Sequence, residues 1–223
     1  MRGTGANGMS TNRVVIFANG TLPDAEKLRG LLRPDDIYLC ADGGTQHALA
    51  LSLNPALVIG DLDSLSDADR LALSKAGAAL MQYSRDKDET DLELAVTHAL
   101  SLKPKAILVA CALGRRLDQT LGNIALMADR RLADVDCRLD DGVEEAFFCR
   151  GSREITGTSG DLVSLIPWGE TVTGVSTQGL RWPLHNEALY PEKTRGISNE
   201  MTDDTATIKI GSGLLLIVHR RKY

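Results

Sequence analysis

The sequence has few cysteines and few aromatic residues, and it contains no long apolar run. Its four cysteines lie far apart without a C-x-x-C pair, which argues against a zinc site and against a disulfide framework. Each cysteine is interpreted as a small buried apolar residue, which suits a reducing cytoplasm. No apolar run reaches the roughly 18 residues that are needed to span a bilayer. We therefore expect a cytoplasmic protein that has no membrane partner.

Clustered positive charge is also missing. Asp and Glu number 30 against 25 Lys and Arg, the formal net charge is −5, and the basic residues are scattered along the chain. Nucleic acid is therefore not an expected partner. The chain lacks the G-x-x-x-x-G-K-[ST] motif of P-loop kinases, and no G-x-G-x-x-G follows the first expected strand. Any phosphate binding must use other groups.

The first twelve residues are polar and rich in glycine, and they lack the apolar core of a signal peptide. We expect residues 1–12 to form a disordered tail. The whole chain, at 223 residues, is long enough for one large domain or two modest ones.

Apolar runs alternate with helical patterns through residues 13–140. Strands that are apolar throughout and separated by helices indicate a parallel sheet covered on both faces. The expected strands are 14–18, 37–41, 57–60 and 106–110. Helices are expected around 23–32, 46–53, 65–79 and 90–102, followed by one that buries Leu121, Ile124, Ala125 and Ala128. This segment is predicted to be a Rossmann-like, three-layer α/β domain that binds a nucleotide and carries catalysis.

The pattern changes near Asp140. From 141 to 223 there is no helical period of useful length, but short runs rich in Val, Ile, Leu and Thr are punctuated by glycine. These runs predict a C-terminal antiparallel β-sandwich domain. The clearest are 162–166, 172–175, 205–210 and 214–219, with a turn at 211–213 between the last two and a long loop over 185–196.

Acidic residues gather where the expected parallel strands end. Asp42, Asp61 and Asp63 each follow such a strand, and Asp88 and Asp91 stand at the start of a later helix. Ligands of parallel sheets bind at this edge, so five carboxylates are expected on one rim. Hard oxygen ligands without Cys or His suit magnesium, and magnesium in turn suggests phosphates. The alternative for any single member is a helix cap.

Two weaker signals belong to the same rim. Gly43 and Gly44 would let the backbone approach a phosphate at a helix N-terminus, although a plain tight turn explains them equally well. Arg116 follows a strand and could bind phosphate oxygens in a bidentate manner. Its alternative is a solvated loop charge or an ion pair with Asp118.

Six strings, in order, resemble the thiamine diphosphokinases (thiamine pyrophosphokinases), and the resemblance covers nearly the whole chain from Val14 onward. The strings are Ala41-Asp42-Gly43-Gly44; Gly60-Asp61-Leu62-Asp63-Ser64; Lys87-Asp88-Glu89-Thr90-Asp91-Leu92-Glu93; Gly114-Arg115-Arg116-Leu117-Asp118-Gln119 with Asn123; Thr177-Gln178-Gly179-Leu180-Arg181-Trp182-Pro183-Leu184; and Ser198-Asn199-Glu200. One departure is that the family usually reads Gly-Gly-Arg where this chain has Gly114-Arg115-Arg116, so the loop can bend differently here.

The resemblance implies a homodimer in which thiamine lies between the catalytic domain of one subunit and the β domain of the other. It implies ATP as co-substrate and Mg²⁺ held by Asp61, Asp63 and Asp91, which with Arg116 would be catalytic. The implied cofactor-binding residues are Asp42, Gly43, Gly44, Asp88, Thr90, Asp118 and Gln119 on the nucleotide side, and Trp182, Ser198 and Asn199 as thiamine contacts.

The expected reaction transfers a pyrophosphoryl group from ATP to the hydroxyl of thiamine, giving thiamine diphosphate and AMP. Asp91 is the first candidate for the base, and Trp182 offers an indole face to the cationic thiazolium, the alternative being a core tryptophan. Trp168 is assigned to packing. Two other functions stay open: a pyrophosphokinase for another alcohol such as a reduced pterin, and a non-catalytic nucleotide or thiamine sensor. Loss of an acidic ligand would favour the sensor, and none is missing.

Overall fold

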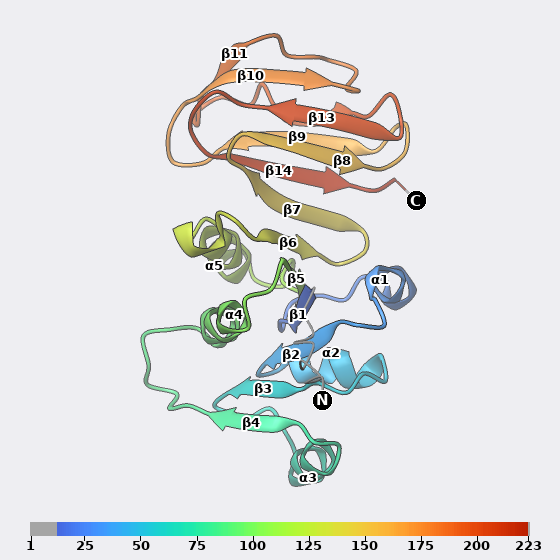
Figure 1. The fold of residues 1–223 in the computed structure, drawn as a ribbon, viewed down its shortest axis with the longest axis vertical. Coiled ribbons are helices and arrows are strands. Elements are labelled where there is room, and N and C mark those ends of the chain that lie inside the picture. Colours follow the sequence, from blue (N-terminus) through green and yellow to red (C-terminus); the bar gives the residue numbers. More distant parts are fainter. Residues whose placement is uncertain (1–12, 223) are drawn as a thin grey trace, which may run out of the picture.

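The computed structural model describes residues 13–222, which form one long sheet with helices on both faces and a smaller second sheet packed at one end (Figure 1). The expected tail, residues 1–12, lies outside the described residues. None of the helices in the described range is long and apolar enough to cross a membrane.

The first part of the chain, residues 13–140, is called the α/β half below. Its strands lie in the order β4-β3-β2-β1-β5-β6, and every neighbouring pair is parallel. Its elements are β1 (Arg13–Phe17), α1 (Ala25–Leu31), β2 (Ile37–Ala41), α2 (Gly44–Ala50), β3 (Leu57–Gly60), α3 (Asp67–Lys75), β4 (Ala79–Gln82), α4 (Asp91–Ser101), β5 (Ala106–Ala110), α5 (Leu117–Met127), the 3₁₀ turn η1 (Arg130–Leu132) and β6 (Asp136–Asp140). The predicted parallel α/β architecture is confirmed.

The remaining described residues, 141–222, are called the β half. They form β7 (Glu144–Cys149), β8 (Ser152–Thr156), β9 (Leu162–Pro167), β10 (Val172–Gln178), β11 (Glu187–Leu189), β12 (Asn199–Glu200), β13 (Thr205–Lys209) and β14 (Leu215–Arg220). Strand β7 pairs antiparallel with β6, so the long sheet continues through β7, β14, β9 and β12. The second sheet has the order β11-β10-β13-β8. The predicted antiparallel C-terminal part is confirmed, while the boundary at residue 140 falls inside a continuous sheet and stays a prediction.

Three local expectations differ from the structure. Strand β4 was missed because it is a half-exposed edge strand and not an apolar run. The link 211–213 joins β13 to β14, but these strands belong to different sheets, so it is a crossover and not a hairpin turn. The long loop expected over 185–196 contains the short strand β11, which pairs with β10.

Alternate residues of β1 point to opposite faces of the sheet, as strand geometry requires. Val14 and Ile16 pack in a core with residues of α4, while Val15 and Phe17 pack in a second core with residues of α1 and α2. A third core fills the space between the two sheets of the β half. Trp168 packs against the first of these cores with its ring 5.6 Å from that of Phe148, which confirms its assignment to packing.

The expected buried stripe of α5 is partly wrong. Leu121 is 50% exposed and Ala125 is also exposed, whereas Met127 is the buried residue of this helix. Leu117, one turn before Leu121, is 74% exposed. The apolar period identifies residues that share a face, but it does not say whether the same chain covers that face.

All four cysteines are buried and free, as expected. Burial raises the pKa of Cys40, Cys111 and Cys137 to about 12. Their thiols are therefore protonated near neutral pH, and they act as apolar packing groups.

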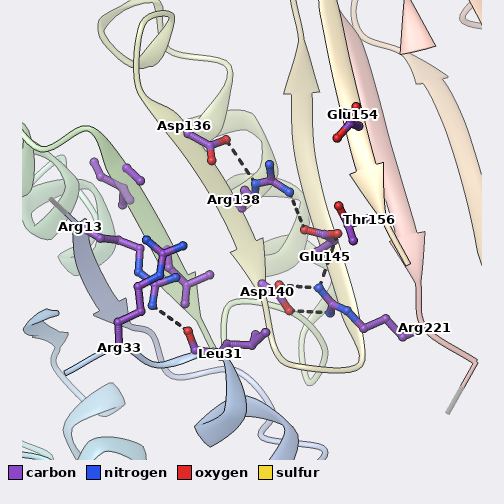
Figure 2. A pocket seen from close by; sticks show the side chains of 13 residues that line it. Arg13, Leu31, Arg33, Asp136, Arg138, Asp140, Glu145, Glu154, Thr156 and Arg221 are labelled. Carbon is purple, nitrogen blue, oxygen red and sulfur yellow. Dashed lines mark hydrogen bonds and ion pairs between the residues drawn. The ribbon is translucent and has the colours of Figure 1, made fainter. Parts of the chain in front are cut away.

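Buried ion pairs tie the β half together and join it to the α/β half. The His219 ring is fully buried and contacts carboxylate oxygens of Glu145 at 2.9 Å and Asp161 at 3.0 Å. Arg221, from the end of the chain, forms a bidentate pair with Asp140 of β6 at 2.9 and 2.8 Å. Figure 2 shows this pair and the Arg138–Glu145 pair beside a cleft of about 330 Å³. Because these charged groups pair with one another, we interpret the cleft as a structural contact between the two halves.

The His219 contacts predict a pH-dependent stability. Burial lowers the pKa of His219, but hydrogen bonds to Glu145 and Asp161 outweigh it, so the pKa is raised above its ordinary value. The His219 ring then binds its proton more tightly in the folded state than in the unfolded state. This contribution is fully present below the unfolded pKa of about 6.5 and is lost as the pH rises through the folded pKa.

We expect the melting temperature of H219Q to lie well below that of the wild type at about pH 6, and the gap to narrow by about pH 9. The exposed His185 supplies the control H185Q, which should follow the wild type at both pH values. A gap that is constant over this range, measured by calorimetry, contradicts the charged state of His219.

Candidate active site

Strand pairing brings three of the predicted carboxylates together. Asp42 follows β2 and Asp61 follows β3, and these neighbouring parallel strands pair Ala41 with Ile59. The Asp42 amide donates to the Ile59 carbonyl at 2.8 Å, which fixes the two strand ends side by side. One oxygen from each of Asp42, Asp61 and Asp63 lies within 4.8 Å of the others. The expected convergence at the carboxyl edge is therefore observed for these three.

The three carboxylates crowd one another. The negative charge of Asp61 raises the pKa of Asp63 above its usual value. The pKa of Asp61 is lowered, first because its carboxylate accepts a hydrogen bond from the Asp63 amide at 3.1 Å. Arg85 contacts Asp61 at 3.9 Å and Asp63 at 3.6 Å, but its side chain is 83% exposed, so it offsets this repulsion only weakly.

Asp91 lies beside the same group at the start of α4, where the Thr90 hydroxyl caps the helix by accepting from the Glu93 amide at 3.2 Å. A Cβ on Gly60 would lie 2.8 Å from the Asp42 Cβ and 3.2 Å from the Asp91 Cγ. Lys87 places its Nζ 2.9 Å from Asp91 Oδ1. That oxygen is nevertheless buried without a hydrogen bond from the described residues, so the contact is an ion pair with poor hydrogen-bond angles.

Asp42, Asp61 and Asp91 line a cavity of about 620 Å³ at the carboxyl edge of the sheet, whereas Asp63 lies outside that lining. Its walls come from the segments that follow β1, β2, β3, β4 and β5. The chain reverses its direction across the sheet between β1 and β5, which is the place where open α/β sheets bind ligands. A cavity of this volume fits a small molecule. Of the predicted site residues, the cavity is lined by Asp42, Asp61, Thr90, Asp91, Arg116 and Gln119.

Four predicted nucleotide-site residues lie outside this lining: Gly43, Gly44, Asp88 and Asp118. The two glycines are required by the protein's own packing. A Cβ on Gly44 would lie 2.0 Å from the Phe17 carbonyl oxygen, and one on Gly43 would lie 2.4 Å from Asn19 Nδ2. These contacts favour the tight-turn alternative for the pair. Asp88 is exposed on the loop before α4.

Arg116 and Asp118 form the ion pair that the sequence offered as the alternative for Arg116. Nε of Arg116 donates to Oδ1 at 3.1 Å and Nη2 donates to Oδ2 at 2.5 Å. This hydrogen bonding is the main reason that the pKa of Asp118 is lowered. Both side chains are about two-thirds exposed, so the pair is a weak surface contact that a ligand could replace.

Sequence reasoning missed several other residues of the cavity. Arg85, Lys87 and Arg115 bring positive charge to it, and Asn19 and Asn123 bring side-chain amides. Lys87 and Arg115 were within recognised strings but received no role. The ion pair of Lys87 with Asp91 spans four residues, a spacing that could have identified it.

The predicted thiamine contacts lie together in the β half. Asn199 is buried, and its side-chain amide bonds the backbone of Trp182 twice, donating to the carbonyl at 2.7 Å and accepting from the N–H at 3.0 Å. The Trp182 side chain is 53% exposed, with the Arg181 guanidinium 5.0 Å from its ring. Ser198 precedes Asn199 and is exposed. Trp182 is therefore a surface platform, and its alternative as a core residue is wrong.

One chain keeps its two groups of site residues far apart. In the sheet order, β12 with Asn199 is first and β3, which precedes Asp61, is ninth. Eight strand spacings of about 4.8 Å put them roughly 38 Å apart along the sheet. A small ligand therefore cannot touch both groups within one chain.

Both parts of the chain match a known family. Residues 28–139 match the family described as "Thiamin pyrophosphokinase, catalytic domain", and residues 153–215 match "Thiamin pyrophosphokinase, vitamin B1 binding domain". A thiamine pyrophosphokinase of Bacillus subtilis (strain 168) is 30% identical over 205 residues, which cover 91% of this chain and 96% of the relative. The chain belongs to the thiamin pyrophosphokinase family.

Other members of the family support this assignment. Thiamine pyrophosphokinase 1 of Oryza sativa subsp. japonica is 27% identical, covering 97% of this chain and 90% of the relative. The crystal structure of the Bacillus subtilis thiamine pyrophosphokinase aligns with a TM-score of 0.85 at 26% identity, covering 95% of this chain and all of the other. That of Geobacillus thermodenitrificans aligns with a TM-score of 0.81 at 26% identity, covering 94% and 98%. The relatives are named thiamine pyrophosphokinases, which are transferases. This member of the thiamin pyrophosphokinase family is therefore an enzyme.

Proposed function

We propose that the protein transfers a pyrophosphoryl group from ATP to the hydroxyl of thiamine, giving thiamine diphosphate and AMP. The observation that carries this proposal is the group of carboxylates facing a ligand-sized cavity at the carboxyl edge of the sheet. Membership of the thiamin pyrophosphokinase family supplies the substrate. Phosphoryl-type transfer depends mainly on positioning and charge neutralisation, for which this cavity has both acidic and basic residues.

The donor set fits Mg²⁺. Asp42, Asp61 and Asp63 offer hard oxygen atoms within 4.8 Å of one another, and the nearby Asp91 has a buried oxygen that is paired with Lys87. The crowding that raises the pKa of Asp63 would be relieved by a cation. The sequence expected Asp61, Asp63 and Asp91 as ligands, whereas the group with close oxygen atoms contains Asp42 in place of Asp91. When bound, Mg²⁺ would neutralise the phosphate oxygens of ATP.

Asp91 is proposed as the general base. Its carboxylate accepts the proton of the thiamine hydroxyl as the alcohol oxygen forms a bond to the β-phosphorus of ATP. The bond between that phosphorus and the bridging oxygen to the α-phosphorus breaks, and AMP leaves. The place of Asp91 in the lining of the cavity supports this assignment, and the Lys87 ammonium, 2.9 Å from Asp91 Oδ1, orients the carboxylate.

The remaining polar residues of the cavity are proposed to hold the nucleotide. Thr90, Arg116 and Gln119 line the cavity and keep this predicted role. The four predicted residues outside the lining would act only indirectly, through the loops that they shape: Gly43, Gly44, Asp88 and Asp118. Thiamine is proposed to rest on the indole of Trp182, with Ser198 and Asn199 beside it.

A homodimer is proposed because one chain cannot bring Trp182 to its own acidic group. Trp182 of one subunit would complete the cavity of the other. The exposed Leu117 and Leu121 on α5 support this arrangement, since the same helix lines the cavity through Gln119 and its apolar face needs a cover. The cytoplasmic location stays a proposal that rests on the four free cysteines.

An activity assay tests the reaction. Purified protein with ATP, Mg²⁺ and thiamine should release AMP and thiamine diphosphate in equal amounts. D61N should lower the rate by about 100-fold or more, because it removes a charge from the metal group. D35N, a charge-matched change on an exposed loop, should keep the wild-type rate.

Three results contradict the proposal in different ways. ADP with thiamine monophosphate excludes pyrophosphoryl transfer. Turnover of a reduced pterin but not of thiamine favours the second substrate class. Binding of thiamine or ATP without any product favours the sensor.

Mixing two inactive variants tests the shared site. D61N removes a charge from the acidic group, and W182A removes the indole that is proposed to bind thiamine. Each variant alone should therefore be nearly inactive. After subunit exchange, about half of the dimers are mixed and each has one intact site, so about a quarter of wild-type activity should return. No recovery, with mixed dimers verified by mass spectrometry, would mean that Trp182 serves the acids of its own chain.

A further inference from the structure

The loop after β5 has an unusual backbone at Arg115. Gly114 has a φ of 75° and Arg115 a φ of 60°, which is the left-handed region that favours glycine. An arginine held there costs free energy relative to glycine. The backbone at Arg115 therefore has a conformation that suits glycine, although the residue is an arginine. A side chain tolerated at this cost suggests a role for its guanidinium.

The Arg115 guanidinium is held at one end only. Its Nη1 donates to the Asn19 side-chain oxygen at 3.1 Å and to the Asn19 carbonyl at 3.4 Å. Within residues 13–222, its Nε and Nη2 make no hydrogen bond, and it has no carboxylate partner. Arg115 lines the 620 Å³ cavity, so these free donors belong to a cavity residue.

The neighbouring Arg116 differs in which of its donors are hydrogen-bonded. Both its Nε and its Nη2 are occupied by Asp118. A phosphate that binds the Nε and Nη2 of Arg116 would have to displace a carboxylate, whereas the corresponding donors of Arg115 are available. Of these two adjacent arginines, Arg115 is therefore the better prepared to bind an anion through Nε and Nη2.

Asn19 is itself fixed by the surrounding loops. The backbone on its C-terminal side bonds the β5 loop, with the Gly20 amide donating to the Cys111 carbonyl at 2.6 Å and the Thr21 amide to the Leu113 carbonyl at 2.9 Å. Its side-chain amide packs on Gly43, where a Cβ would lie 2.4 Å from Nδ2. Asn19 thus holds the guanidinium from a rigid support where three loops meet.

We propose that Arg115 binds the polyphosphate of the nucleotide through Nε and Nη2 while Asn19 holds Nη1. A planar guanidinium suits this task because two parallel N–H groups match two phosphate oxygens. Arg115 then contributes more to phosphate binding than Arg116 does. The inference rests on the proposed function in taking a nucleotide as the cavity's ligand, and it assigns to Arg115 a contact that the family pattern does not provide.

Binding of Mg·ATP, and of inorganic tripolyphosphate, measured by calorimetry without thiamine tests the proposal. R115G should weaken both by about 10-fold or more, because a charged hydrogen-bonding partner is lost. Its melting temperature should stay equal or rise, because glycine suits the left-handed backbone. The loss can then not be attributed to unfolding. R115K should recover part of the affinity, since it keeps the charge without the planar fork.

Two further variants sharpen the comparison. R116A should weaken binding less than R115A does. R131A should leave binding unchanged, because Arg131 is paired with Asp129 two residues away, as Arg116 is with Asp118, but lies outside the cavity. In steady state, R115G should raise the KM for ATP and leave the KM for thiamine unchanged.

Wild-type affinity in R115G, or a larger loss in R116A than in R115A, overturns the inference even if thiamine diphosphate is formed. Conversely, tripolyphosphate binding that depends on Arg115 in a protein that forms no thiamine diphosphate supports the inference and rejects the proposed function. A wild-type protein that binds neither polyphosphate rejects both.

Discussion

Repulsion between carboxylates at the ends of β2 and β3 is the constraint on which the site depends. Parallel pairing fixes Asp42 beside the strand end that precedes Asp61 and Asp63, so the chain cannot separate these charges without breaking the sheet. The charge of Asp61 raises the pKa of Asp63, while a hydrogen bond from the Asp63 amide lowers the pKa of Asp61. The nearby cation Arg85 is mostly exposed and offsets little of the repulsion. A bound cation would stabilise such a group, and this supports the proposed magnesium site.

A second constraint comes from the length of the sheet. Because β7 pairs with β6, the α/β half and the β half share one sheet of ten strands. The Arg221–Asp140 and Arg138–Glu145 pairs reinforce the junction, so the two halves are joined firmly and do not fold over one another. The acids and Trp182 therefore stay at opposite ends of each chain. An active site that needs both must draw on two chains, which makes assembly a condition for the proposed activity.

The sequence predicted the α/β half well because its strands are short apolar runs and its acids follow them directly. Strand β4 was missed because an exposed edge strand has no such run. The crossover between β13 and β14 was missed because a glycine-rich link is the same in sequence whether its strands pair or separate. Burial of Leu121 was wrongly expected because periodicity cannot tell a face covered by the same chain from a face left for another one.

Within the site, the spacing in the sequence predicted which side chains would lie close together. It did not predict which of them would already be in contact with other residues of the protein. Gly43 and Gly44 contact the protein's own Asn19 and Phe17, and Arg116 is taken by Asp118, details that depend on contacts between distant loops. The same contacts between loops distinguish Arg115, whose Nε and Nη2 make no hydrogen bond to the described residues, from Arg116.

A crystal structure with Mn²⁺ and a non-hydrolysable ATP analogue tests the central claim most directly. The account predicts anomalous density about 2.0–2.3 Å from oxygens of Asp42, Asp61, Asp63 or Asp91, bridging to the phosphates. A bound nucleotide whose metal lies away from all four carboxylates would contradict it.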